Sequence, residues 1–372
     1  MKVFAVLRGF PGLGRVMSGL TILETLKKEH SANIKLYTYM QGVTALKLFD
    51  FQNFMNNEVS SNEITSLGLD PVGKTSVKIM NEILSWQPDI VIVDGEPLLI
   101  NLIALCYDRN KIISLLNPSD LENDSLPYST KRFFQSSFLN CACGIVHGYE
   151  TENDYSMYDN VIYINTILRN RIIDLKKNVG NCQEKSHNIT CILGGGSKSS
   201  NVEFIESTLN LGKNIIQAAS LLSEYYFNIY SNDNYLIEEL NQGEKPFNVS
   251  VKEHIGTEKD LYLNTDLAIC RAGRNTTSEI LFLNIPCILV AAGKDYRASE
   301  QRKNITNIIQ KYNYGAFQYD NISHLNLVEI IKKAVNLKKI DNGFEPGNKK
   351  ALVKIMDIYN RNREKESHLI KR

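Results

Sequence analysis

Side chains suited to nucleotide binding are concentrated between residues 270 and 304, where the chain reads CRAGRNTTSEILFLNIPCILVAAGKDYRASEQRKN. A buried strand is predicted to end at Cys270, and a turn containing Gly273 leads into a helix that the polar residues 275–278 can cap. The start of such a helix presents free backbone N–H groups and a positive dipole end, which suits a phosphate. Glu279 lies one turn inside this helix, where an acid can accept two hydrogen bonds from a ribose diol. The pattern indicates a nucleotide site, although an ordinary strand–helix–strand unit with a capped helix fits it equally well.

A second glycine-rich turn follows another predicted strand, residues 188–193. The turn reads GGGSKSS from Gly194, and a helix is expected to begin near Val202. Three consecutive glycines allow the backbone to approach a diphosphate closely. Ser197 adds a hydroxyl donor and Lys198 adds a positive charge. We therefore expect the helix starts after the two turns to converge on one diphosphate.

The first half of the chain contributes an acidic turn. Residues 88–97 read PDIVIVDGEP, which predicts a buried strand ending near Asp94, with Glu96 two residues later. In doubly wound sheets, ligands bind outside the carboxyl ends of the strands, so Asp94 and Glu96 are candidate general bases. The alternative is that these two acids only cap the following helix, because acidic side chains favour helix starts.

Together these segments resemble the nucleotide-sugar glycosyltransferases of the GT-B fold, most closely the peptidoglycan-precursor N-acetylglucosaminyltransferase family. The shared order is a glycine turn, Thr276, the pair Ser278-Glu279, and then a polar pair followed by an Asn. That family usually has Gln-Gln where this chain has Glu300-Gln301. The resemblance implies a donor site with Ile255 beside the nucleotide base, formed by Gly14, Arg169, Gly195, Gly196, Ser197, Ile255, Gly273, Arg274, Asn275, Thr276, Glu279, Glu300 and Gln301.

Arg15 departs from the family pattern. It ends a glycine-rich turn, RGFPGLGR, after a predicted strand at Lys2 to Leu7, and the family usually has His at this position. An arginine stays protonated at physiological pH and cannot act as a general base. The candidate catalytic residues are therefore Asp94 and Glu96 as the base, and Arg15 as a group that holds a phosphate or an acid. The alternative is a surface arginine at a helix start.

Composition predicts a globular protein of two domains. The chain has 372 residues, of which 43% are hydrophobic, and its 42 Lys and Arg nearly balance its 41 Asp and Glu. This balance gives no basic field for nucleic-acid binding. No signal peptide or membrane-spanning run is evident, so we expect a cytoplasmic protein with at most peripheral membrane contact. The seven cysteines are odd in number and lack CxxC spacing, which favours free thiols over disulfides or a zinc site.

The expected fold class is α/β, with two Rossmann-like doubly wound domains that face a cleft, as the GT-B resemblance implies. Residues 1–165 would bind the acceptor, residues 166–347 would bind the donor, and residues 348–372 would form a helix that returns to the first domain. A helix is expected over residues 76–86. The stretch 117–128 is expected to be a loop, and its three acids, Asp120, Glu122 and Asp124, could bind a cation but do not match an EF-hand spacing.

The resemblance implies an inverting glycosyltransferase. It would move a sugar, N-acetylglucosamine or a related hexose, from a UDP-sugar to an acceptor hydroxyl on a small molecule, a saccharide or a lipid-linked sugar. We expect no cofactor and no metal, since helix dipoles would stabilise the leaving diphosphate. Two alternatives stay open. One is a nucleotide-sugar 2-epimerase or hydrolase, although the Asp-Ser-Gly-Gly loop of the epimerases is missing. The other is a non-catalytic nucleotide-sugar-binding subunit.

Overall fold

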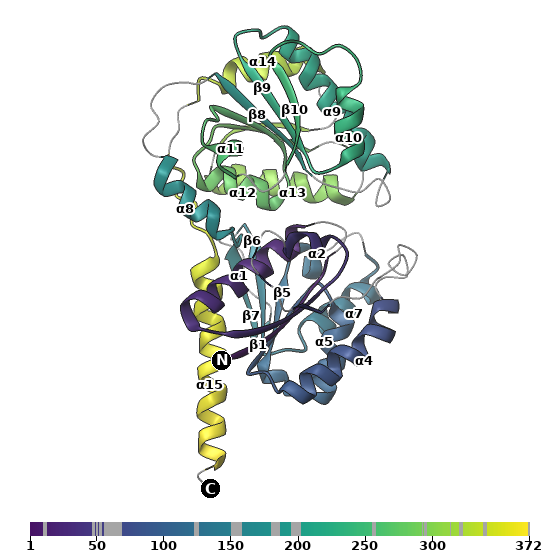
Figure 1. Ribbon diagram of the computed structural model, residues 1–372, viewed down its shortest axis with the longest axis vertical. Helices are drawn as coiled ribbons and strands as arrows, with labels where there is room; N and C mark the ends of the chain where they lie inside the picture. Colours follow the sequence, from purple (N-terminus) through teal and green to yellow (C-terminus); the bar gives the residue numbers. More distant parts are fainter. Residues whose placement is uncertain are drawn as a thin grey trace. The chain divides into compact units, whose positions relative to one another are not determined.

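The computed structural model forms two compact units, Met1–Ile167 with Gly347–Arg372, and Leu168–Pro346. Figure 1 shows both units coloured along the sequence. The structure describes the chain apart from residues 10–12, 47–48, 50, 52–53, 56–68, 123–125, 150–157, 180–186, 195–201, 255–257, 292, 294–295, 313, 320–322, 338–340 and 371–372.

The first unit contains a seven-stranded sheet in the order β3-β2-β1-β4-β5-β6-β7, with every pair parallel. Its strands are β1 (Lys2–Leu7), β2 (Asn33–Thr38), β3 (Phe54–Met55), β4 (Ile90–Asp94), β5 (Ile112–Leu116), β6 (Cys143–Gly148) and β7 (Val161–Asn165). The central strands are continuous apolar runs because helices cover both faces of the sheet. The strand order reverses between β1 and β4, and a doubly wound sheet binds its ligand at that reversal.

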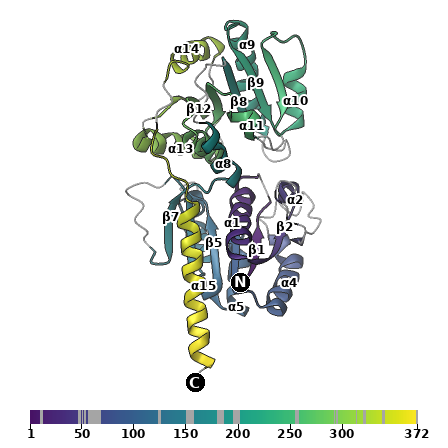
Figure 2. The ribbon, with the colours of Figure 1, turned by 60° about the vertical axis from the view of Figure 1, so that its left-hand side comes forward.

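Two helical layers sandwich this sheet (Figures 1 and 2). The helices are α1 (Gly14–His30), α2 (Gln41–Leu46), α4 (Leu69–Trp86), α5 (Pro97–Cys106), the short 3-10 helix η1 (Arg109–Lys111), α6 (Pro118–Glu122), α7 (Tyr128–Phe138) and α15 (Asn348–Ile370). Side chains of α1 and α15 share one core with the sheet, and those of α4, α5 and α7 share the other. The C-terminal helix α15 is therefore part of the core of the first unit.

The second unit contains a six-stranded parallel sheet in the order β10-β9-β8-β11-β12-β13. Its elements are β8 (Asn188–Gly194), β9 (Tyr226–Ser231), β10 (Val249–Glu253), β11 (Leu267–Arg271), β12 (Cys287–Ala291), β13 (Ala316–Tyr319), and the helices α8 (Asn170–Val179), α9 (Val202–Ser220), α10 (Asn234–Asn241), α11 (Glu258–Tyr262), α12 (Arg274–Phe282), α13 (Tyr296–Tyr312) and α14 (His324–Ala334). Helices α9 and α14 share a core with one face, and Figure 1 shows α11, α12 and α13 on the other. The strand order reverses here between β8 and β11.

Three expectations about helices were wrong in detail. The stretch 117–128 is not all loop, because α6 occupies its first half, where Pro118 provides a preset φ angle and Leu121 is buried. Helix α4 starts at Leu69 rather than near residue 76, and Pro71 is tolerated because the first turn of a helix does not use its N–H groups. Residues 275–278 do not cap α12, since Gly273 occupies the N-cap position without a side-chain cap.

The described part of the chain contains no helix that is long and apolar enough to cross a membrane. Six cysteines in it carry free thiols, as expected from their number and spacing. It contains no group of three or more His, Cys, Asp or Glu side chains that could hold a metal ion.

Candidate functional site

The carboxyl ends of the central strands bring the predicted acids of the first unit together. Leu7 of β1 pairs with Thr38 of β2 and with Asp94 of β4, so these three strands end level with one another. The residues that directly follow them therefore meet at one edge of the sheet. This edge carries the acidic turn and the start of α1 with Arg15.

Arg15 is held between two carboxylates. Its Nη1 donates to Oδ1 of Asp94 at 3.0 Å and to Oδ2 of Asp120 at 2.9 Å, and its Nη2 donates to Oδ1 of Asp120 at 2.5 Å. Burial works to lower the pKa of Arg15, but the charges of Asp120 and Asp94 outweigh burial and raise it. The arginine is thus permanently charged and is not a free surface side chain. Asp120, suggested by the sequence as one of three cation ligands, instead binds this guanidinium.

Glu96 has a different environment from Asp94. It follows Gly95, whose φ of 77° is accessible to glycine, and it occupies the N-cap of α5 without a capping hydrogen bond. Its Oε1 accepts a hydrogen bond from the Tyr39 hydroxyl, and the residue is only 7% exposed. Burial raises the pKa of Glu96, while the Arg8 charge, the Tyr39 hydrogen bond and the Arg15 charge oppose that rise. Glu96 therefore occupies the start of α5, as the alternative of a helix-capping pair expected, but its side chain does not cap the helix.

Sequence reasoning missed two members of this group. Tyr39 directly follows β2, and Arg8 directly follows β1 and donates from Nη1 to the Gly95 carbonyl at 3.0 Å. Both lie where the rule about strand ends would have placed them, once β1, β2 and β4 were known to be neighbours. The histidine of β6, His147, is fully buried within that strand.

In the second unit the predicted donor residues lie around the turn between β11 and α12. Gly273 is the N-cap of α12, and Arg274 is its first residue. Thr277 donates from Oγ1 back to the Gly273 carbonyl at 2.8 Å, which closes the first turn of the helix. Gly273, Asn275 and Thr276 remain partly exposed, so the N–H groups of this helix start can reach a ligand.

Glu279 lies in the same helix, and its carboxylate is engaged by two side chains. Arg169 donates from Nε to Oε1 and from Nη2 to Oε2, both at 2.8 Å. The Tyr262 hydroxyl donates to Oε2, also at 2.8 Å. The structure thus brings Arg169 and Glu279, both predicted donor residues, into direct contact. Tyr262 was not anticipated.

Gln301 is connected to the same turn by a hydrogen bond from Arg271, the last residue of β11. The guanidinium of Arg271 donates from Nη2 to Oε1 of Gln301 at 3.3 Å, and from Nη1 to the Phe204 carbonyl and to Ser207 Oγ, at 3.2 and 3.0 Å. Asn304 Nδ2 donates to the Ala272 carbonyl at 2.9 Å, so α13 is attached to the turn. Glu300, next to Gln301, is partly exposed.

The remaining predicted residues are dispersed or undescribed. Gly14 is exposed at the start of α1, in the first unit. Gly195, Gly196, Ser197 and Ile255 lie outside the described residues. The described chain reaches Gly194, whose φ of 79° begins that glycine turn and whose carbonyl accepts a hydrogen bond from Ser231 Oγ at 3.3 Å.

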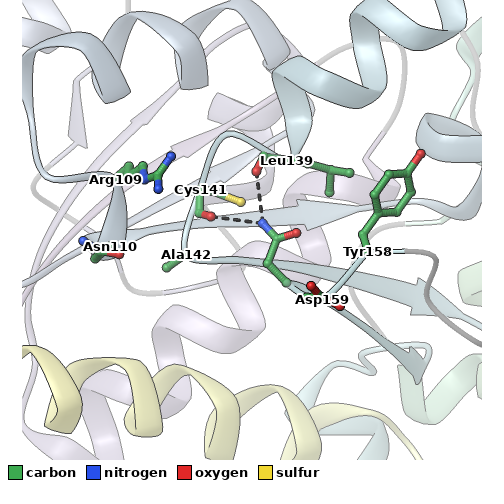
Figure 3. A pocket seen from close by; sticks show the side chains of 8 residues that line it. Arg109, Asn110, Leu139, Cys141, Ala142, Tyr158 and Asp159 are labelled. Atoms are coloured by element: carbon green, nitrogen blue, oxygen red, sulfur yellow. Dashed lines mark hydrogen bonds between the residues drawn. The ribbon is translucent and has the colours of Figure 1, made fainter.

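A cavity of about 460 Å³ lies elsewhere in the first unit and includes none of these residues. Figure 3 shows its lining, which is Arg109, Asn110, Leu139, Cys141, Ala142, Tyr158, Asp159 and Asn160. These residues directly precede β5, β6 and β7, so the cavity lies at the amino ends of the strands, opposite the edge that carries Arg15. At this cavity, Asn160 Nδ2 donates hydrogen bonds to the Leu139 and Cys141 carbonyls, at 3.0 and 3.1 Å. The chemistry is not expected in this cavity, because doubly wound parallel sheets bind ligands at the carboxyl ends of their strands.

Comparison of the sequence with known families and proteins points to glycosyltransferases. Residues 190–359 match the glycosyltransferase family 28 C-terminal domain. The chain is 22% identical over 331 residues, 86% of each protein, to the UDP-N-acetylglucosamine--N-acetylmuramyl-(pentapeptide) pyrophosphoryl-undecaprenol N-acetylglucosamine transferase of Lactococcus lactis subsp. lactis (strain IL1403). It is 31% identical to the protein of the same name from Staphylococcus haemolyticus (strain JCSC1435) over 116 residues, 31% of this chain and 29% of that protein.

Solved structures share the fold over nearly the whole chain. MurG of Acinetobacter baumannii has a TM-score of 0.60 at 14% identity and covers 96% of this chain and 100% of its own. The UDP-GlcNAc 2-epimerase of Neisseria meningitidis bound to UDP-GlcNAc has a TM-score of 0.61 at 16% identity, with both chains fully covered. UGT89C1 of Arabidopsis thaliana complexed with UDP has a TM-score of 0.64 at 12% identity, covering 97% and 94%. The predicted class of two Rossmann-like α/β domains is confirmed.

Proposed function

We propose that this chain, a glycosyltransferase of the GT-B fold with a family 28 C-terminal domain, transfers a hexose such as N-acetylglucosamine from a UDP-sugar to an acceptor hydroxyl. The curated relatives from Lactococcus and Staphylococcus are named as transferases of this sugar. The observation that carries the proposal is the β11–α12 turn, where a helix start, Glu279 and Gln301 lie together. The acceptor is a saccharide, a lipid-linked sugar or a small molecule.

Each part of the donor has a partner in the second unit. The N–H groups at the start of α12, with Arg274, bind the diphosphate. Glu279 accepts a ribose hydroxyl, and Gln301 with Glu300 binds the sugar hydroxyls. Arg169, Ser197 and Ile255 complete the site as the family resemblance implies, Ile255 beside the base.

The transfer is a single displacement with inversion. The acceptor oxygen forms a bond to the anomeric carbon as the bond from that carbon to the diphosphate oxygen breaks. The acceptor proton passes to a base, and the electron pair leaves with UDP. Helix dipoles worth about half a positive charge each, together with Arg274, stabilise the negative charge that develops on the diphosphate, so the reaction proceeds without a metal.

Glu96 is the better base of the two predicted acids. Asp94 is fully buried and its carboxylate is ion-paired with Arg15, so accepting a proton would cost it that ion pair. Glu96 contacts a neutral hydroxyl, and burial raises its pKa toward the range in which a base is effective. Arg15 then supports catalysis indirectly, by fixing Asp94 and Asp120 beside this acid.

The test is the product distribution from UDP-N-acetylglucosamine with and without a panel of saccharide, aminoglycoside and lipid-linked acceptors. A transferase releases UDP in proportion to glycosylated acceptor. Inversion of configuration at C2 of the sugar without any acceptor would instead identify a 2-epimerase, an activity found among the solved structures that share this fold. Binding of UDP with no turnover on any acceptor would indicate a non-catalytic binding subunit.

A further inference from the structure

We propose that Tyr262 is a positioning residue that, with Arg169, fixes the Glu279 carboxylate and makes the donor site selective for ribonucleotides over deoxyribonucleotides. The inference rests on the proposed function, because it assumes that Glu279 contacts the ribose. It adds a residue that neither the sequence motifs nor the comparisons single out. Glu279 is then not an isolated ligand of the ribose, because Tyr262 and Arg169 both bind its carboxylate.

The three side chains come from separate elements of the second unit. Tyr262 is the last residue of α11, Arg169 directly precedes α8, and Glu279 lies in α12. Tyr262 is 1% exposed and Glu279 is 4% exposed. Since packing on all sides holds the phenol ring, its hydroxyl position is set by the fold. The burial of Tyr262 and the Glu279 charge raise the pKa of the phenol, so it remains a donor at physiological pH.

The hydrogen bonds leave the carboxylate little freedom to rotate. An ionised carboxylate offers about four lone-pair sites. Oε2 accepts from Arg169 Nη2 and from Tyr262, and Oε1 accepts from Arg169 Nε and also lies 2.8 Å from Arg169 Nη2. The three donated hydrogen bonds leave one of these sites open within the described structure, and one ribose hydroxyl can fill it.

A fixed acceptor discriminates better than a mobile one. A site built to hydrogen-bond a hydroxyl rejects the analogue that lacks it, because the buried polar group is left unpaired. Without the Tyr262 hydroxyl, Oε2 regains a free lone-pair site and Arg169 alone orients the carboxylate, so the acceptor site for the ribose is less well fixed. The ribose contact then weakens, while contacts to the base and the diphosphate are unaffected.

The experiment measures calorimetric Kd values for UDP, 2′-deoxy-UDP and 3′-deoxy-UDP on the full chain. The wild type should bind UDP roughly tenfold or more tightly than at least one deoxy analogue, the loss typical of a charge-assisted hydrogen bond. Tyr262→Phe should reduce that ratio severalfold by weakening UDP binding, with the affinity for the discriminated analogue unchanged. A double variant with Glu279→Gln should show no further effect of Tyr262→Phe on the ratio.

Tyr314→Phe is the matched control, because Tyr314 is a buried tyrosine of the same unit whose hydroxyl has no hydrogen-bond partner in the described structure. It should leave all three Kd values unchanged. If Tyr262→Phe does not fold, Tyr262→Met fills the site with a flexible apolar side chain and is measured in the same way. A wild-type ratio kept intact in the folded Tyr262 variant would overturn the positioning role. Equal binding of UDP and both analogues by the wild type would instead overturn the ribose contact in the proposed function.

Discussion

Glu96 is the residue on which the proposed chemistry depends, and its hydrogen bond to Tyr39 gives a pH test. That bond lowers the pKa of Glu96 against the effect of burial, so Tyr39→Phe should raise it further. A base must be deprotonated to act, so the acid limb of kcat/KM should move to higher pH while the plateau changes little. Tyr107→Phe is the control, because its hydroxyl bonds the Pro88 carbonyl at the other end of β4. An acid limb that stays in place, or moves to lower pH, would remove Glu96 as the base.

Replacing the base itself should separate activity from stability. Glu96→Gln should lower turnover by roughly 10²–10⁴, the usual contribution of a positioned base. Asp94→Asn should retain far more turnover. This variant would lose one carboxylate that binds Arg15, but the two hydrogen bonds from Arg15 to Asp120 would remain.

The same Glu96→Gln variant should gain stability relative to the wild type as the pH rises above 4.5, the ordinary pKa of a glutamate. The pKa of Glu96 is raised above its ordinary value of 4.5 in the folded protein, so the unfolded chain loses its proton first as pH rises. The wild type therefore loses stability as pH rises through the folded pKa, and the glutamine variant does not. Thermal unfolding of both proteins between pH 5 and 8 should show that the Tm of the variant minus the Tm of the wild type increases with pH. A Tm difference that stays constant or decreases with pH would contradict a raised pKa of Glu96 in the folded protein.

At the residue scale, the sequence predicted which side chains gather but not how they pair. Asp94 and Glu96 were found because strand ends in parallel sheets carry ligand residues. Their different roles depend on Arg15, Tyr39 and Asp120, which lie far from them in sequence. Glu279 was found from its motif, but Tyr262 was not, because a tyrosine at the end of a five-residue helix carries no local signal.

At the scale of elements, Arg271 connects β11, α9 and α13, and its replacement should loosen sugar recognition. Its guanidinium is buried, stacks on Phe204 and bonds Gln301. Arg271→Lys cannot reproduce this planar fork, so Gln301 should lose its fixed position. We expect a higher KM for the UDP-sugar with a nearly unchanged Kd for UDP.

The control for this variant is a purely structural asparagine in the same unit. Asn248 Nδ2 bonds the Ala219, Leu222 and Tyr225 carbonyls at the end of α9, and Asn248→Ala should cost about 1–3 kcal/mol of stability. It should lower the Tm without changing the ratio of KM to Kd. If both variants change that ratio alike, the effect of Arg271 is only a loss of stability.

The strands were easier to predict than the helix starts. A continuous apolar run of five or six residues is unambiguous when both faces of a parallel sheet are covered, so β1, β4, β8 and β11 lie within about two residues of their expected positions. Helix starts depend on caps, and α12 uses the backbone of Gly273 where polar side chains were available. Helix α6 is too short to show a hydrophobic period.

At the scale of the molecule, α15 completes the core of the first unit although it is the last helix of the chain. Ile355 is fully buried in that core, whereas Val353 on the same helix is 52% exposed. Ile355→Ala should cost about 2–5 kcal/mol of unfolding free energy and Val353→Ala much less. Calorimetric unfolding measures both, and UDP affinity should be unchanged in either variant. Equal losses would mean that α15 does not contribute to the core.

The fold class could be predicted from motifs that recur in one fold, whereas the identity of the acceptor could not be predicted from the sequence. No local rule converts a mostly polar stretch such as residues 56–68 into the identity of an acceptor. The donor class could be predicted because phosphate and ribose impose specific residue types at specific turns.

The most direct test of the proposed transfer is the anomeric configuration of the product, determined by proton NMR after reaction of UDP-N-acetylglucosamine with an accepted acceptor in excess EDTA. The account predicts an acceptor-linked sugar with a large coupling between H1 and H2, which is the inverted β configuration, formed at an undiminished rate. A product with the small coupling of the retained α configuration would contradict the single displacement. A reaction that stops in EDTA and resumes only with magnesium or manganese would contradict stabilisation of the leaving group by helix starts and arginines alone.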